Sequence, residues 1–156
     1  MPKVPILVGI GLFSLLAPCA EAPLVPYTVC EVLRDLPAYE GKSVAALGRY
    51  SFRGDGRWIG EQACEGTTPP LLWLTEDTQS GPKAPGDFVL DAVALSQKLT
   101  DIRKHTSLGK FRFGSTDYDR WAVVYGRVQM RTGDAAKKAA ADLVFRGDGV
   151  IIFLNQ

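Results

Sequence analysis

The chain has 156 residues, of which 46% are hydrophobic and 22% charged, and its formal net charge is +1. This composition excludes a disordered chain, which would hold fewer apolar residues and a less balanced charge. A near-neutral chain also cannot bind nucleic acid or anionic membranes through net charge alone, so binding of that kind would need a local basic patch. The length fits a single folded domain.

The N-terminal segment has the pattern of a secretory signal peptide. An uncharged apolar run at residues 4–16 follows Lys3 and precedes small residues that suit a signal peptidase. Such a run spans about 20 Å as a helix, which is too short for a bilayer core of about 30 Å. We therefore expect residues 1–22 to be cleaved, with cleavage after Ala20 as an alternative. Residues 23–156 would then form one exported domain, in the periplasm or outside the cell.

The three cysteines fit this export. Cys19 follows a sequence that approximates the bacterial lipoprotein box, but Pro18 replaces the small residue of that box, so we expect Cys19 to leave with the signal peptide rather than to carry a lipid anchor. Cys30 and Cys64 form an even pair, which predicts one disulfide in an exported domain. Free thiols are the alternative. The sequence supports a metal site even less, because these cysteines and the only histidine, His105, do not have the spacing of a known set of metal ligands. We expect no metal and no cofactor.

A capping box marks the first predicted helix. Thr28 and Glu31 have the Thr-x-x-Glu spacing in which each side chain caps the backbone amide of the other, just before apolar residues at helical spacing. Pro37 ends this pattern. We therefore expect a short helix over residues 28–36 that carries Cys30.

Three extended segments follow this helix. Residues 42–53 and 57–62 are joined by a Gly-Asp-Gly turn, which predicts a β-hairpin with a bulge at Gly48 in its first strand. Residues 71–74 form a short apolar run that is typical of a buried strand. We expect residues 75–86 to be a loop.

A long helix and two strands complete the predicted domain. Asp87 is a suitable N-cap for residues 88–104, in which apolar residues recur at three- and four-residue spacing. Residues 120–131 form a strand interrupted by Gly126. The last strand covers residues 143–154, with apolar ends on either side of an Arg-Gly-Asp-Gly sequence.

The order of these elements is a helix, three strands, a helix and two strands. It is the order of a small five-stranded barrel of the oligonucleotide/oligosaccharide-binding (OB) type. Glycines in the first and fourth strands would let these strands bend tightly enough to close the barrel. We therefore expect an all-β fold with helices: an OB-like barrel with a short N-terminal helix and one long helix between its third and fourth strands.

Parts of the sequence resemble a group of uncharacterised exported bacterial OB-like proteins. The resemblance covers residues 28–74 and rests on three motifs: Val-Cys-Glu-Val-Leu at residues 29–33, Tyr-Glu-Gly-Lys-x-Val-x-x-x-Gly at residues 39–48, and Trp58-Ile59 ahead of Cys64. It implies a periplasmic or envelope domain in which a disulfide ties the first helix to the second strand. It implies no catalytic residues.

The sequence contains no recognisable catalytic motif. Its only histidine, His105, lies where the predicted long helix ends, a position at which histidine usually stabilises the helix dipole. We therefore expect a protein that is not an enzyme. A remote alternative is a divergent metal-dependent phosphodiesterase or nuclease, for which Glu61 and Arg49 would be a partial match on an OB barrel.

Basic residues on the first and fourth barrel strands form the predicted binding site. Because alternate residues of a strand share a face, we expect an inward set made of Val44, Ala46, Gly48, Tyr50, Phe52, Ala122, Val124, Gly126, Val128 and Met130. The outward set, beside Trp121, would form a basic stripe suited to an anionic ligand: Arg49, Arg53, Tyr125, Arg127 and Arg131. The loop after the long helix adds Lys110 and Arg112 next to aromatic residues.

These observations favour a non-enzymatic exported module that binds an envelope component, namely a protein, an anionic glycan or a lipid head group. Export argues against nucleic acid as the partner. The alternative is a structural or interaction subunit, which would be a lipoprotein if Cys19 were lipidated. The sequence leaves open whether Trp58 and Trp73 are surface stacking platforms or core residues, and their apolar neighbours favour the core.

Overall fold

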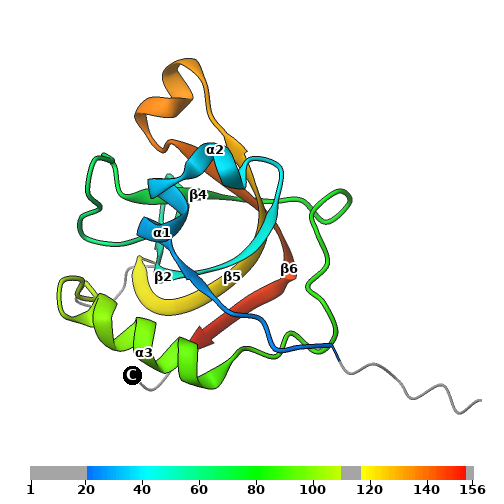
Figure 1. Cartoon of the computed structure of the whole chain (residues 1–156). Coiled ribbons are helices and arrows are strands. Elements are labelled where there is room, and N and C mark those ends of the chain that lie inside the picture. Colours follow the sequence, from blue (N-terminus) through cyan, green and yellow to red (C-terminus); the bar gives the residue numbers. More distant parts are fainter. Residues whose placement is uncertain (1–20, 110–116, 154–156) are drawn as a thin grey trace, which may run out of the picture.

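A computed structural model describes residues 21–109 and 117–153, which form a β-barrel with helices around it (Figure 1). Five strands close the barrel in the order β2-β3-β4-β6-β5, with β5 pairing back to β2, and a short strand, β1, adds to β2. The predicted OB-like barrel is confirmed. The strands are β1 (Tyr27–Thr28), β2 (Ser43–Arg53), β3 (Gly56–Gly60), β4 (Leu71–Glu76), β5 (Tyr118–Met130) and β6 (Ala141–Phe153).

The first strands pair in chain order, as the predicted hairpin requires, whereas the last three do not. β2 and β3 form the antiparallel hairpin, and β3 continues antiparallel to β4. β4 then pairs in parallel with β6, which comes last in the sequence, and β6 pairs antiparallel with β5. The long connection between β4 and β5 therefore has to pass outside the barrel, and it carries the longest helix of the described residues.

The first helix has the predicted capping box. In α1 (Val29–Arg34), the Glu31 amide donates to the Thr28 hydroxyl at 3.1 Å, and the Thr28 amide donates to the Glu31 carboxylate at 2.7 Å. Pro37 does not end the helical segment, contrary to expectation. It lies in the first turn of a second short helix, α2 (Leu36–Tyr39), where its missing N–H leaves no hydrogen bond unmade.

The long helix begins later than predicted. α3 (Ala92–Arg103) has Asp91 as its N-cap, whose side chain accepts from the Ala94 amide at 2.9 Å, so the expected start after Asp87 is wrong. The residues in between contain a turn, with Phe88 at a φ of 53°, and then a bridge from Leu90 to Leu24 of the N-terminal segment, where the Leu24 amide donates to the Val89 carbonyl at 2.8 Å. A short 3-10 helix, η1 (Gly133–Lys137), connects β5 to β6.

Two hydrophobic cores lie on the two faces of β2 and β5. The first core fills the barrel and includes Val29 and Val32 of α1, and it confirms most of the predicted inward set: Val44, Ala46, Tyr50, Ala122, Val124 and Val128. Met130, at the end of β5, is instead 47% exposed. The second core lies outside the barrel, where α3 packs on the opposite face of β2 and β5 through Leu99, Ile102, Ala45, Leu47, Trp121 and Val123.

The two strand glycines have different roles. β2 pairs with β5 in unbroken register through Gly48, so the bulge predicted there is wrong. Gly48 instead permits a close approach, because a Cβ at this position would lie 2.8 Å from the Gly60 carbonyl oxygen. In β5 the register with β6 shifts between Val124 and Gly126, which confirms the interruption predicted in that strand.

Cys30 and Cys64 form the predicted disulfide. It ties α1 to the connection between β3 and β4, close to but beyond the second barrel strand. Residues 1–20, which hold most of the predicted signal peptide and Cys19, lie outside the described residues. In the described part of the chain, no helix is long and apolar enough to cross a membrane.

Candidate functional site

The predicted arginines of β2 and β5 do not form one stripe. In the antiparallel register Arg127 lies opposite Ser43, at the far end of β2 from Arg49. At about 3.3 Å per residue, the strand between Ser43 and Arg49 is about 20 Å long. Arg49 and Arg53 therefore lie at one end of the strand pair, and Arg127 and Arg131 lie at the other.

Arg49 and Arg127 each donate a hydrogen bond to a backbone carbonyl group of a loop. Arg49 donates to the Ser107 carbonyl oxygen at 2.8 Å, in the segment that follows α3. Arg127 donates to the Ser80 carbonyl oxygen at 3.2 Å, in the connection that follows β4. Both guanidinium groups thus have a backbone partner.

The long helix covers much of the surface on which the stripe was expected. Trp121 is only 3% exposed, so its ring is not available to a ligand. Tyr125 is half-buried and lies edge-on to Phe88, with ring centroids 6.1 Å apart. Lys110 and Arg112 lie outside the described residues.

A row of aromatic and basic side chains lies on the outer face of β3 and β4 instead. Trp58 and Trp73 are directly opposite each other, and their rings stack with centroids 5.6 Å apart. The Arg53 guanidinium lies 6.0 Å from the Trp58 ring centroid. On the other side, Arg131 and Lys138 lie 5.3 Å and 5.9 Å from the Trp73 ring centroid. We call Arg53, Trp58, Trp73, Arg131 and Lys138 the tryptophan row.

The two tryptophans are surface residues, so the expectation that they belong to the core is wrong. Both are half-buried, and neither belongs to the two hydrophobic cores described above. The alternation of strand residues could have predicted their outward position. Ile59 and Leu72 fill the barrel, and because neighbouring strand residues point to opposite faces, Trp58 and Trp73 must point outward.

A glycine allows the close contact at the centre of the row. Gly56 begins β3 with a φ of 147°, a conformation that other residues rarely adopt. A Cβ at this position would lie 2.4 Å from the Trp73 ring. The predicted Gly-Asp-Gly turn therefore both closes the hairpin and leaves space for the indole.

Arg53 is fixed at its end of the row by a buried carboxylate. Its Nη2 lies 2.7 Å from Asp119, whose side chain is only 3% exposed. Burial alone would raise the pKa of Asp119, but hydrogen bonds from Ser51, the Gly109 amide and Arg53 outweigh it and hold that pKa below its ordinary value. Asp119 is therefore a carboxylate at neutral pH, and it keeps the Arg53 guanidinium beside Trp58.

The other end of the row has an excess of positive charge. Arg131 donates through Nε to Asp142 at 3.0 Å, and the second oxygen of Asp142 accepts from the Thr75 hydroxyl at 3.0 Å. Lys138 is exposed, and among the described residues it has no ion-pair partner. Its charge is therefore free to attract an anion to the edge of Trp73.

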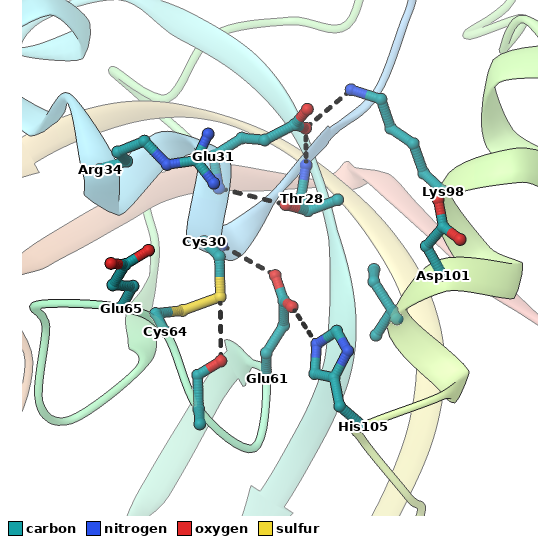
Figure 2. Close-up of a pocket in the computed structure, with 12 residues that line it drawn as sticks. Thr28, Cys30, Glu31, Arg34, Glu61, Cys64, Glu65, Lys98, Asp101 and His105 are labelled. Atoms are coloured by element: carbon teal, nitrogen blue, oxygen red, sulfur yellow. Dashed lines mark hydrogen bonds and ion pairs between the residues drawn. A yellow bond between two sulfur atoms is a disulfide. The ribbon is translucent and has the colours of Figure 1, made fainter.

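A separate pocket of about 420 Å³ lies between α1, α3 and the connection from β3 to β4 (Figure 2). Glu61 contributes a buried carboxylate to it, with a side chain only 2% exposed. One of its oxygens accepts from the Cys30 amide at 2.8 Å, and the other lies 2.9 Å from His105 Nε2. His105 thus binds Glu61, and the Cys30–Cys64 disulfide forms part of the same wall.

Carboxylates outnumber basic groups around this pocket. Lys98 bridges to Glu31 at 2.7 Å across its upper side, as Figure 2 shows. Two more carboxylates, Glu65 and Asp101, line it. The Thr28 hydroxyl caps α1. In the described residues the pocket thus offers carboxylate and imidazole groups and no free nucleophile.

Comparison with known proteins gives no relative: no protein-family model, no curated protein and no solved structure matches the chain. What the protein does must therefore be inferred from its own residues.

Proposed function

We propose that the chain is a non-enzymatic binding module for an anionic glycan of the cell envelope, and that the tryptophan row is its binding surface. The observation that carries the proposal is the stacked pair of half-exposed indoles with basic groups at both ends. The stacked indoles hold the cations in place and offer their exposed edges as apolar contact surface to a sugar, and the basic groups would bind carboxylate, phosphate or sulfate substituents.

The position of the row on the barrel supports this function. In OB barrels the outer face of the second and third strands is a common binding surface for oligosaccharides and oligonucleotides. β3 and β4 are the second and third strands of this barrel, and they carry Trp58 and Trp73. The opposite side, on β2 and β5, is covered by α3. The row is thus on the side of the barrel that a ligand can reach.

Charge favours an anionic ligand over a neutral one. Arg53 and Arg131 are each balanced by one aspartate, whereas Lys138 adds an unbalanced positive charge. A disulfide is also typical of proteins that fold in an oxidising compartment, which supports the proposed export to the periplasm or beyond. Envelope glycans with acidic groups are the ligands that such a protein would meet.

The test is a binding titration with a defined acidic glycan. Oligogalacturonate is a suitable carboxylated probe, and neutral dextran of the same length is its control, with tryptophan fluorescence as the signal. We expect the acidic glycan to bind and dextran to bind weakly or not at all. Trp73→Ala should reduce affinity about tenfold, since it removes the ring that holds two cations, Arg131 and Lys138, each worth about 0.5–1 kcal/mol at an exposed site.

Two neighbouring lysines provide a matched pair of variants. Lys138 lies over Trp73, whereas Lys137 forms an exposed ion pair with Asp134 at 2.7 Å. Lys138→Ala should weaken binding about two- to fivefold, as expected for the loss of one exposed cation next to a ring. Lys137→Ala should have no effect. Equal losses in both variants, or binding that survives Trp73→Ala, would overturn this assignment of the surface.

Arg131→Gln and Arg127→Gln test the same surface against the stripe expected on β2 and β5. Arg131 belongs to the tryptophan row, and Arg127 does not. We expect the first variant to lose affinity and the second to keep it. The reverse result would move the binding surface back to the β5 side of the barrel.

A further inference from the structure

The pocket in Figure 2 brings together four side chains that commonly bind zinc. We propose that, once the Cys30–Cys64 disulfide is reduced, the two thiolates, the Glu61 carboxylate and the His105 imidazole bind one Zn²⁺ ion. The ligand atoms of Cys30, Glu61 and Cys64 all lie within 4.8 Å of one another. His105 Nε2 lies 2.9 Å from the nearer oxygen of Glu61.

The separations among the ligand atoms of Cys30, Glu61 and Cys64 approach those of a tetrahedral site, whereas His105 lies outside that group, on the Glu61 oxygen that the Cys30 amide does not bind, and would have to turn toward it. Zinc binds sulfur at about 2.3 Å and nitrogen or oxygen at about 2.1 Å, so neighbouring ligand atoms lie about 3.4–3.8 Å apart. The imidazole and the nearer carboxylate oxygen therefore need to separate by about half an ångström, while the exposed His105 side chain turns toward the sulfur atoms. The two sulfur atoms separate when their bond is reduced. A rotation of each side chain is enough, because the Cα atoms of Cys30 and Cys64 are 5.2 Å apart.

Glu61 is already held in the orientation that a ligand needs. Its side chain is 2% exposed, and the Cys30 amide fixes one of its oxygens at 2.8 Å. Burying a carboxylate is costly unless it has a strong partner, and in the oxidised protein that partner is a histidine that is 48% exposed. In the reduced protein a divalent cation would provide the opposite charge from inside the pocket.

The four ligands come from three parts of the chain. This explains why their spacing in the sequence did not indicate a metal site. Cys30 lies in α1, Glu61 and Cys64 follow β3, and His105 follows α3. A bound ion would join these parts as the disulfide does, and it would add the end of α3 to the junction. The site would thus replace one cross-link with another when the redox state changes.

The chemistry balances as a two-electron exchange. A dithiol reductant gives two electrons and two protons to the Cys30–Cys64 bond, becomes a disulfide itself, and leaves two free thiols. Zn²⁺ then binds with release of the two thiol protons to solvent. Oxidation by a disulfide-bonded partner runs the same step in reverse and expels the ion.

The test is a metal titration of the purified chain in its oxidised and reduced forms, with Co²⁺ as a spectroscopic probe. We expect reduced protein, kept in a phosphine reductant, to give the intense visible bands and thiolate charge-transfer bands of tetrahedral cobalt, and Zn²⁺ to displace them. Oxidised protein should give neither. Equal spectra in the two states, or only the weak bands of an octahedral ion, would overturn the proposal.

Two variants identify the ligands that are not cysteine. Glu61→Gln and His105→Gln keep the disulfide, so their folding can be checked in the oxidised state before reduction. Each should weaken Zn²⁺ binding by at least about tenfold. Mutating a group that only supports a metal ligand already weakens metal binding by about 10–100-fold, and loss of a ligand should cost no less. Glu65→Gln changes a carboxylate that lines the same pocket and is not one of the four proposed ligands, and it should leave the affinity unchanged.

The metal titration still tests the proposal if reduction unfolds the chain. Zn²⁺ should then restore the near-ultraviolet circular dichroism of the wild type but not that of Glu61→Gln, and reduced wild type that stays unfolded with Zn²⁺ would overturn the proposal. Wild-type affinity in either glutamine variant would do the same. The site shares no residue with the tryptophan row, so this result is independent of glycan binding.

Discussion

Replacing Asp119 with alanine should be among the most destabilising single changes in this protein. The carboxylate is nearly fully buried and accepts from the Gly109 amide at 2.7 Å and from the Ser51 hydroxyl. Ser51 is itself only 2% exposed. Alanine would leave the buried Ser51 hydroxyl without a partner, at about 1–3 kcal/mol, and would remove the hydrogen bond of the exposed Gly109 amide, at about 0.5–1.5 kcal/mol. Arg53 is 31% exposed and can turn to water, so its lost ion pair adds at most about 1 kcal/mol.

The expected loss in the free energy of unfolding is therefore about 1.5–5.5 kcal/mol at neutral pH. It should depend on pH in a defined direction. The fold lowers the pKa of Asp119, so the stabilisation is fully present above the unfolded pKa of about 3.9 and is lost as pH falls through the lower folded value. The difference in the free energy of unfolding between the wild type and Asp119→Ala should therefore become smaller below about pH 4.

Urea unfolding followed by tryptophan fluorescence measures both effects, at neutral pH and at a series of acidic values. The control is Asp101→Ala, which removes an ion pair with Lys104 in which both side chains are 70% exposed. That change should alter stability by no more than about 0.5 kcal/mol. An equally small change for Asp119→Ala, or a difference that stays constant as the pH falls, would refute this reasoning.

Three further changes test the fold. Thr28→Ala removes half of the capping box and should cost about 1 kcal/mol in a urea titration, whereas Thr28→Ser should cost little. Gly48→Ala places a Cβ 2.8 Å from the Gly60 carbonyl and should cost about 1–3 kcal/mol; a neutral result would mean that β2 and β3 can separate freely. Changing Cys30 and Cys64 together to serine opens a loop with a sequence separation of 34 and should cost about 3.5–4 kcal/mol in metal-free buffer, measured as the shift in the urea midpoint.

Local patterns predicted the barrel well because each depends on neighbouring residues only. The two-residue alternation of β2 and β5 predicted most of the inward side chains, with Met130 as the exception, and the Thr28-x-x-Glu31 spacing predicted the first helix with its capping box. The same alternation in β3 and β4 predicts outward tryptophans. That rule is stronger evidence than the apolar character of their neighbours, which pointed the other way.

Long-range contacts explain the parts that the sequence did not predict. Asp87 and Asp91 are equally good N-caps, and the structure uses Asp91 because the residues before it pair with the strand-like segment around Leu24. Nothing in the amphipathic pattern of α3 shows that it covers Trp121. In the same way, the approach of Glu61 to His105 depends on how α3 ends against β3.

The two cores share their central strands, and this has a consequence for how the domain can open. β2 and β5 are packed on both faces, by the barrel interior on one side and by α3 on the other. Detaching α3 would expose the apolar outer face of these strands, including Leu47 and Trp121, so an opening in which the helix leaves while the barrel stays intact is strongly disfavoured. Barrel and helix should therefore be lost together in a single cooperative transition, and only the periphery is left for smaller motions.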